Sequence, residues 1–156
     1  MGRYPIFQSP QLDEVERRMG SCRPWHAGPL GKDTRKLIEI LTEDQAELNS
    51  LGLTHEQVAR RLRELTSRAK EGWGEPVCVD NKFLITIQDA RGKLPCPWGH
   101  PGLYRKTHIE LKNSKTGEFL VWSDLSIHMV EAHGFYQGKG SVYRLDPSRL
   151  KKILEL

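Results

Sequence analysis

Residues 54–87 read THEQVARRLRELTSRAKEGWGEPVCVDNKFLITI, and the spacing of apolar residues changes within this stretch. Up to residue 69 the apolar positions recur every three or four residues, which is typical of one face of an α-helix. These positions are Val58, Leu62, Leu65 and Ala69. Thr54 and Gln57 stand three residues apart at the start and fit a capping box. We therefore expect a helix from residue 54 to about residue 71.

After Gly72 to Gly74 the apolar residues alternate with polar ones, as they do in a half-buried strand. The alternating positions are Val77 and Val79, followed by Phe83, Ile85 and Ile87. The pair Asp80-Asn81 between them favours a turn, so this segment predicts a β-hairpin. A second hairpin is predicted from residues 107–111 and 118–122, with residues 113–117 as its turn. Together they indicate a mostly antiparallel sheet.

Helices are predicted on both sides of these hairpins. Ser9-Pro10 can open a helix ending at Gly20, and Asp33 can cap a second one, with a possible break at Thr42. Ser123 can cap a helix over residues 124–132, residues 142–145 can form a short strand, and residues 146–147 can begin a final helix. The predicted fold is α+β, with a helical N-terminal half packed on a small antiparallel sheet, a helix after the second hairpin and a C-terminal helix.

Length and composition favour one domain over residues 1–156, mainly helical over 1–75, with the sheet and two helices over 76–156. The chain is 37% hydrophobic and 28% charged, which excludes an intrinsically disordered protein. No apolar run approaches the ~20 residues of a membrane span, and no apolar export core follows the first residue, so we expect a cytoplasmic protein. Three cysteines, an odd number, favour thiols or thiolates over a disulfide framework.

Two Cys/His pairs form the strongest candidate for a functional site. Cys96-x3-His100 precedes the second predicted hairpin, and His128-x4-His133 lies on the helix after it. Thiolate and imidazole are ligands that suit Zn²⁺, so we expect a structural zinc site. The order of elements resembles a ββα zinc finger in outline only, because the first pair contains one cysteine and 27 residues separate the pairs instead of about a dozen.

Two alternatives concern the same residues. His128 and His133 are about 140° apart around a helix, so both could face inward only if the last turn is distorted, and they could instead border the core in ordinary hydrogen bonds. The segment Cys22-Arg-Pro-Trp-His26 is also a Cys-x3-His pair, so Cys22 and His26 are lesser alternative ligands.

A catalytic interpretation rests on the helix over residues 124–132. Asp124, His128 and Glu131 share one helical face, where carboxylate and imidazole could polarise a metal-bound water. In this alternative the protein is a metal-dependent hydrolase with His128 and His133 as ligands and Glu131 as base. The spacing matches neither His-Glu-x-x-His nor His-x-x-Glu-His, and a solvated helix face explains the same pattern.

Basic residues offer a third interpretation, a metal-free nucleic-acid or protein adaptor. The net charge is +4, and the candidate contact residues are Arg60, Arg61, Arg63, Arg105 and Lys106. The arginines of residues 60–63 alternate with Glu56 and Glu64, which also fits ion pairs on a solvated helix face. The sequence names no partner and no substrate, and its leading interpretation is a zinc-stabilised binding protein.

Overall fold

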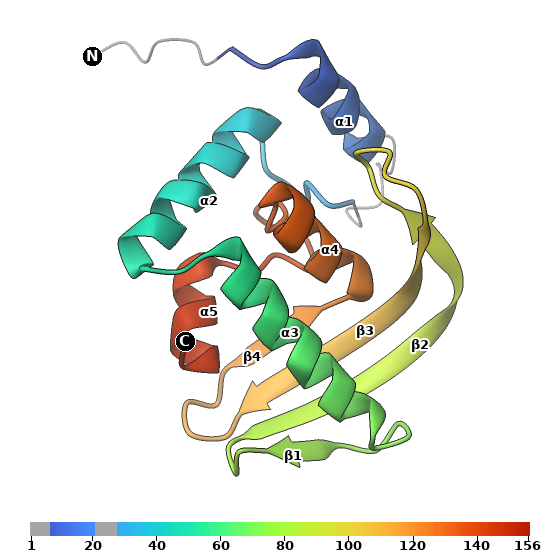
Figure 1. Ribbon diagram of the computed structural model, residues 1–156, viewed down its shortest axis with the longest axis vertical. Helices are drawn as coiled ribbons and strands as arrows, with labels where there is room; N and C mark the ends of the chain where they lie inside the picture. The colour runs from blue at the N-terminus through green and yellow to red at the C-terminus, as the bar shows by residue number, and fades with distance from the viewer. Residues whose placement is uncertain (1–6, 21–27) are drawn as a thin grey trace.

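The computed structural model describes residues 7–20 and 28–156, and it has the predicted α+β architecture (Figure 1). Its elements, in chain order, are α1 (Pro10–Gly20), α2 (Leu37–Leu51), α3 (His55–Lys70), β1 (Val77–Val79), β2 (Phe83–Pro95), β3 (Leu103–Asn113), β4 (Phe119–Trp122), α4 (Asp124–His133) and α5 (Pro147–Leu154). In the described residues no helix is long and apolar enough to cross a membrane.

The sheet is an antiparallel meander in the order β1-β2-β3-β4. Its central strands are longer than the alternating apolar pattern indicates, because β2 and β3 stay paired as far as Pro95 and Leu103. β1 pairs only with residues 83–85 of β2, and β4 pairs only with residues 109–112 of β3. Residues 88–95 and 103–108 therefore form a two-stranded extension of the sheet, with a bulge between Ala90 and Lys93.

The helices α3 and α4 begin at the predicted caps and lie over one face of the sheet (Figure 1). The Thr54 hydroxyl accepts a hydrogen bond from the backbone N–H of Gln57 at 3.1 Å, which confirms the capping box. Ser123 makes the same contact with the N–H of Ser126 at 3.1 Å. Gly134 ends α4 in the left-handed region at φ 63°, where glycine has no side chain to clash.

The start of α2 differs from the prediction that Asp33 caps this helix. The carboxylate of Asp33 binds Arg35 instead and accepts a hydrogen bond from the backbone N–H of Lys139. The first amides of α2 are satisfied from the N-terminal segment, because Glu16 accepts from the N–H of Leu37 at 2.7 Å and Gln8 accepts from that of Ile38 at 2.8 Å. α2 then continues through Thr42 without a break.

Residues 142–145 do not form the predicted strand. Leu145 makes one backbone hydrogen bond to Tyr136 at 3.1 Å, and Arg144 turns inward to bind both carboxylate oxygens of the buried Asp44 at 2.6 and 2.9 Å. This charge pair connects the segment to α2, and backbone pairing with the sheet does not develop.

Buried side chains form two core regions. The larger lies between the sheet and α3, α4 and α5, and includes Phe83 and Trp122. The smaller joins α1, α2 and α4, and it includes Val15, Met19, Met129 and Cys96. One residue of the predicted zinc site thus belongs to the core that holds α1.

Candidate metal centre

Cys96 and His100 lie on a tight turn at the far end of the paired strands β2 and β3. The carbonyl of Cys96 accepts a hydrogen bond from the N–H of Gly99 at 2.9 Å, and Pro97 occupies the second position of this turn, which its fixed φ favours. Gly99 has φ 81°, and a Cβ there would lie 3.2 Å from a nitrogen of Arg18. The local sequence therefore folds the Cys-x3-His pair back on itself beside α1.

His128 and His133 reach the same place from α4. The helix keeps its hydrogen bonds to its end, with the N–H of Gly134 donating to Val130 at 3.1 Å and that of Phe135 to Met129 at 3.1 Å. The centroids of the two imidazole rings nevertheless lie only 5.3 Å apart. The prediction that both histidines could face inward only through a distorted last turn is therefore wrong.

The four side chains converge on one point. One ligand atom each from Cys96, His100, His128 and His133 lies within 4.8 Å of all the others. The sulfur of Cys96 is 3.3 Å from Nε2 of His133. In a tetrahedral zinc site with Zn–S of about 2.3 Å and Zn–N of about 2.0–2.1 Å, ligand atoms lie roughly 3.3–3.6 Å apart. A small contraction would give this geometry, so the group could hold a metal ion.

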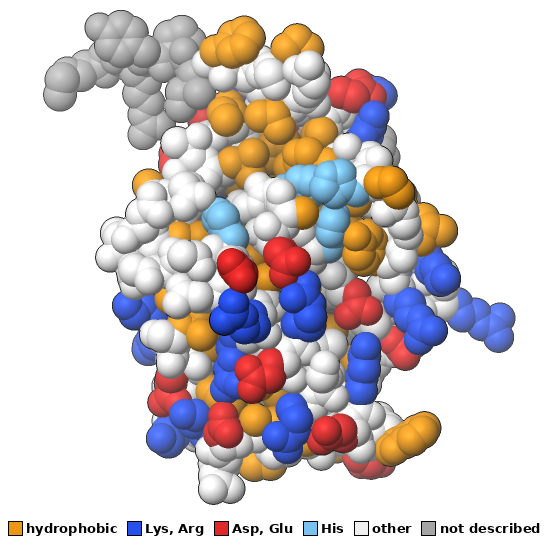
Figure 2. Space-filling model, in the orientation of Figure 1, with side chains coloured by type: hydrophobic (Ala, Val, Ile, Leu, Met, Phe, Trp, Pro, Cys, Tyr) orange, Lys and Arg blue, Asp and Glu red, His pale blue; other side chains and the backbone are white. Residues whose placement is uncertain are grey.

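Aromatic side chains form the walls of this cluster. Trp98 stacks on the ring of His133 with centroids 4.1 Å apart and an interplanar angle of 6°. Tyr104 stacks on His128 with centroids 4.7 Å apart. Such contacts fix the orientation of each imidazole, as outer contacts do around metal ligands. The cluster lies at the edge of the core, because Cys96 is buried while His100 is exposed to solvent. Figure 2 shows histidine side chains gathered at the surface.

The electrostatic surroundings favour neutral imidazoles. Burial, with the neighbouring His100 and His128, lowers the pKa of His133 to about 4. Burial and His100 also lower the pKa of His128, against an opposing effect of Glu131. The Nε2 atom of His128 is buried and has no hydrogen-bond partner within the described chain. A neutral ring with an unsatisfied buried nitrogen is the form in which histidine binds metal.

The carboxylates of the catalytic interpretation lie beside this cluster and outside it. Asp124, His128 and Glu131 line one cleft of about 390 Å³ between α3 and α4, as their shared helical face predicts. Glu131, however, forms an ion pair with Arg63 at 2.8 Å, and neither carboxylate belongs to the group of converging ligand atoms. Cys22 and His26, the lesser alternative ligands, lie outside the described residues.

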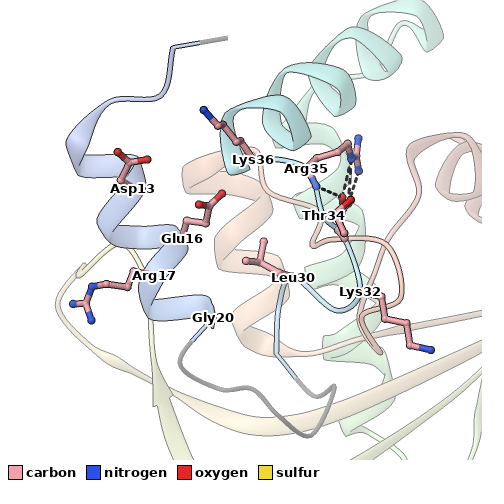
Figure 3. Close-up of a pocket in the computed structure, with 10 residues that line it drawn as sticks. Asp13, Glu16, Arg17, Gly20, Leu30, Lys32, Thr34, Arg35 and Lys36 are labelled. Atoms are coloured by element: carbon pink, nitrogen blue, oxygen red, sulfur yellow. Dashed lines mark hydrogen bonds and ion pairs between the residues drawn. The ribbon is translucent and has the colours of Figure 1, made fainter. Parts of the chain in front are cut away.

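A larger cavity, of about 630 Å³, lies between α1 and residues 30–36 (Figure 3). Asp13 and Glu16 on α1 form one side of it, and Lys32 and Lys36 lie on the other. The described residues that line it include no cysteine or histidine. Glu16 accepts a hydrogen bond from the N–H of Leu37 and so connects α1 to α2. None of the four converging ligands lines this cavity, so it is separate from the candidate metal site.

The candidate basic contact residues fall into two sets. On α3, Arg60 pairs with Glu56 at 2.9 Å, Arg61 with both Glu64 and Asp80, and Arg63 with Glu131. These pairs match the solvated helix face considered above. On β3, Arg105 and Lys106 are exposed and form no ion pair within residues 7–20 and 28–156.

Sequence reasoning did not place Tyr104 in the site, because its position at the start of β3 carries no spacing signal. Trp98 could have been found, since it lies between Cys96 and His100 in the Cys-x3-His segment.

A scan of protein-family models and searches of curated proteins and of solved structures find no match to this chain.

Proposed function

We propose that this chain is a zinc-stabilised binding protein whose metal is held by Cys96, His100, His128 and His133. The observation that carries the proposal is the convergence of all four ligand atoms within 4.8 Å. One thiolate and three imidazoles match the borderline-soft character of Zn²⁺, and four protein ligands complete its preferred tetrahedral shell.

The proposed zinc connects parts of the chain that are distant in sequence. Cys96 and His100 lie on the turn between β2 and β3, and His128 and His133 lie on α4. Because metal affinity of this kind appears as folding free energy, zinc would stabilise the junction between the sheet extension and the smaller core. Its role is then structural, and binding of a partner falls to the surfaces that it holds in place.

The rival proposal, a metal-dependent hydrolase, has weaker support. Such a site needs three protein ligands, an open position for water and a base within reach. Here His100 supplies a fourth ligand atom, and the carboxylate of Glu131 is paired with Arg63. A metal shell with only three protein ligands and one water would support the hydrolase proposal instead.

A reducing compartment such as the cytoplasm suits the proposal. The site needs Cys96 as a thiolate, and both Cys78 and Cys96 are free thiols. Disulfides persist in oxidising compartments, where Cys96 would be exposed to competing oxidation.

Zinc content and thermal stability, measured together, test the proposal. The protein is purified without a histidine tag and without added metal, and the parent should contain about one zinc per chain. Cys96→Ser should lose most of this zinc and lower the melting temperature by roughly 5 °C or more, since about 1 kcal/mol corresponds to about 2–4 °C in a domain of this size.

Cys78→Ser is the matched control, because Cys78 is an exposed free thiol on β1, away from the cluster. It should keep both zinc and melting temperature. A parent without zinc that also melts at the same temperature with and without chelator would refute the proposed function.

A further inference from the structure

The two-stranded extension of the sheet carries an excess of positive charge. We call residues 88–95 of β2 and 103–108 of β3 the basic ribbon. Its cations are Arg91, Lys93, Arg105 and Lys106, all exposed, and its one carboxylate is Asp89. Lys93 pairs with Arg105 across the strands, and Lys106 pairs with Ala90. Four positive charges therefore stand within a few residue pairs of one another.

These cations differ from the arginines of α3 in being unpaired. Arg60, Arg61 and Arg63 each meet a carboxylate within 3.1 Å. In the part of the chain that the structure describes, none of the four ribbon cations forms an ion pair. Arginines that are already paired with a carboxylate contribute little to the attraction of a polyanion, so the ribbon offers more available positive charge than the arginines of α3. Figure 2 shows Lys and Arg side chains projecting over β2 and β3 at the right-hand edge.

The shape of the ribbon suits a groove of a nucleic acid. Neither of its edges is paired with another strand, because β1 and β4 stop at the pairs made by residues 83–85 and 109–112. α4 packs on the β3 side, where the N–H of Asp124 donates to the hydroxyl of Thr107, so the β2 side is the open one. A pair of strands is about 5 Å between backbones, and the major groove of B-DNA, about 12 Å wide, admits such a ribbon. The bulge between Ala90 and Lys93 adds local twist, as bulges do.

The proposed metal centre closes the far end of the same ribbon. Cys96 follows the last residue of β2, and His100 stands three positions before Leu103, the first residue of β3. The turn between them is packed against α4 through the Trp98–His133 stack. The ribbon is thus held at its end rather than left to fray, which reduces the entropy lost when it binds.

We propose that the basic ribbon binds duplex DNA through the phosphate backbone, with the ribbon in the major groove. The four cations supply contacts that are independent of base sequence, because phosphate contacts position a protein and carry no sequence information. This proposal rests on the charge and shape of the ribbon and not on the identity of the metal.

Fluorescence anisotropy with a labelled 20-base-pair DNA duplex, titrated from 50 to 200 mM NaCl, tests the proposal. Four phosphate contacts predict a slope of log affinity against log salt of roughly −3.6, equivalent to about a 100-fold loss over this range. The double variant R105Q/K106Q should flatten the slope by about 2 and weaken binding at 50 mM salt at least tenfold. R91Q/K93Q, on the other strand, should do the same.

The matched control is R60Q/R68Q on α3, which removes the same charge from arginines paired with Glu56 and Glu71. It should leave the slope within about 0.5 of the parent's. Far-ultraviolet circular dichroism and the melting temperature show that each variant is folded.

Three results would overturn the proposal. The first is no binding of the parent to DNA at 50 mM salt. The second is an equal loss in the α3 control, which would indicate a diffuse charge effect. The third is equal or stronger binding to an A-form RNA duplex, whose major groove is too narrow for the ribbon, or to anionic phospholipid vesicles.

Discussion

His128 and His133 are candidate metal ligands because of their surroundings more than because of their spacing. Each imidazole stacks on an aromatic ring, Tyr104 for His128 and Trp98 for His133. Burial lowers the pKa of both rings and so favours their neutral forms. A histidine that only bordered the core would place its buried ring nitrogen against a carbonyl or carboxylate, yet Nε2 of His128 has no such partner within the described chain.

A double-mutant cycle tests whether the two histidines share one ion. We expect His128→Ala and His133→Ala each to remove most of the bound zinc, and the double variant to be little less stable than either single variant. The free energy of unfolding, measured in urea with and without chelator, gives the coupling. Chelator should destabilise the parent and leave all three variants unchanged.

His108→Ala is the control for loss of an imidazole. His108 contacts the hydroxyl of Tyr143 at 3.3 Å, away from the cluster, so this variant should retain zinc and its sensitivity to chelator. Additive losses at positions 128 and 133, insensitive to chelator, would mean that these two histidines merely pack against the core.

Among the elements, helix ends with a local signal were predictable. Thr54 and Ser123 cap their helices within three residues, so the sequence contains both partners of each contact. The start of α2 was not predictable, because its amides are satisfied by Glu16 and Gln8 from the N-terminal segment. Asp33 has the chemistry of a cap, but Arg35 and Lys139 take its carboxylate.

In the sheet, too, the parts with a local sequence pattern were predictable, and the parts that depend on distant residues were not. Alternating apolar residues mark a strand only where one face is buried, so β2 was expected to end near Ile87. Beyond that point the side chains on both faces of β2 are exposed, and β2 nevertheless remains paired with β3 as far as Pro95. The grouping of Cys96 and His100 with the histidines of α4 was predictable from residue type and order, whereas the contribution of Tyr104 depends on strand register.

The position of α1 depends on the turn that carries two of the proposed ligands. Arg18 donates a hydrogen bond to the carbonyl of Pro97 at 3.0 Å, and Trp98 lines a groove of about 450 Å³ with Leu12 and Val15. If zinc fixes this turn, its removal should loosen α1 before the rest of the molecule unfolds.

Hydrogen–deuterium exchange measured by mass spectrometry checks this expectation. Chelator should raise the exchange of amides in α1 about tenfold or more and leave those in α3 unchanged, because α3 belongs to the larger core. The same protection of α1 with and without zinc would show that its contacts with α2 suffice, and the metal proposal would then stand without this consequence.

At the scale of the whole molecule, the proposed zinc lies where the two core regions and the ribbon meet. The larger core contains the sheet and α3, and the smaller one contains Cys96 together with Val15 and Met19 of α1. α4 contributes buried residues to both, Val130 to the larger and Met129 to the smaller. A metal bound to α4 and to the end of the ribbon would therefore join the proposed binding surface to both core regions.

X-ray absorption at the zinc K edge, on untagged protein, tests most directly whether these four side chains hold the metal. We expect a four-coordinate shell of one sulfur at about 2.3 Å and three imidazole nitrogens at about 2.0–2.1 Å. A shell without sulfur would contradict the proposed site, because Cys96 would then not bind the metal. A shell with only two imidazoles and with oxygen ligands would also contradict it, because one of the three histidines would then not bind.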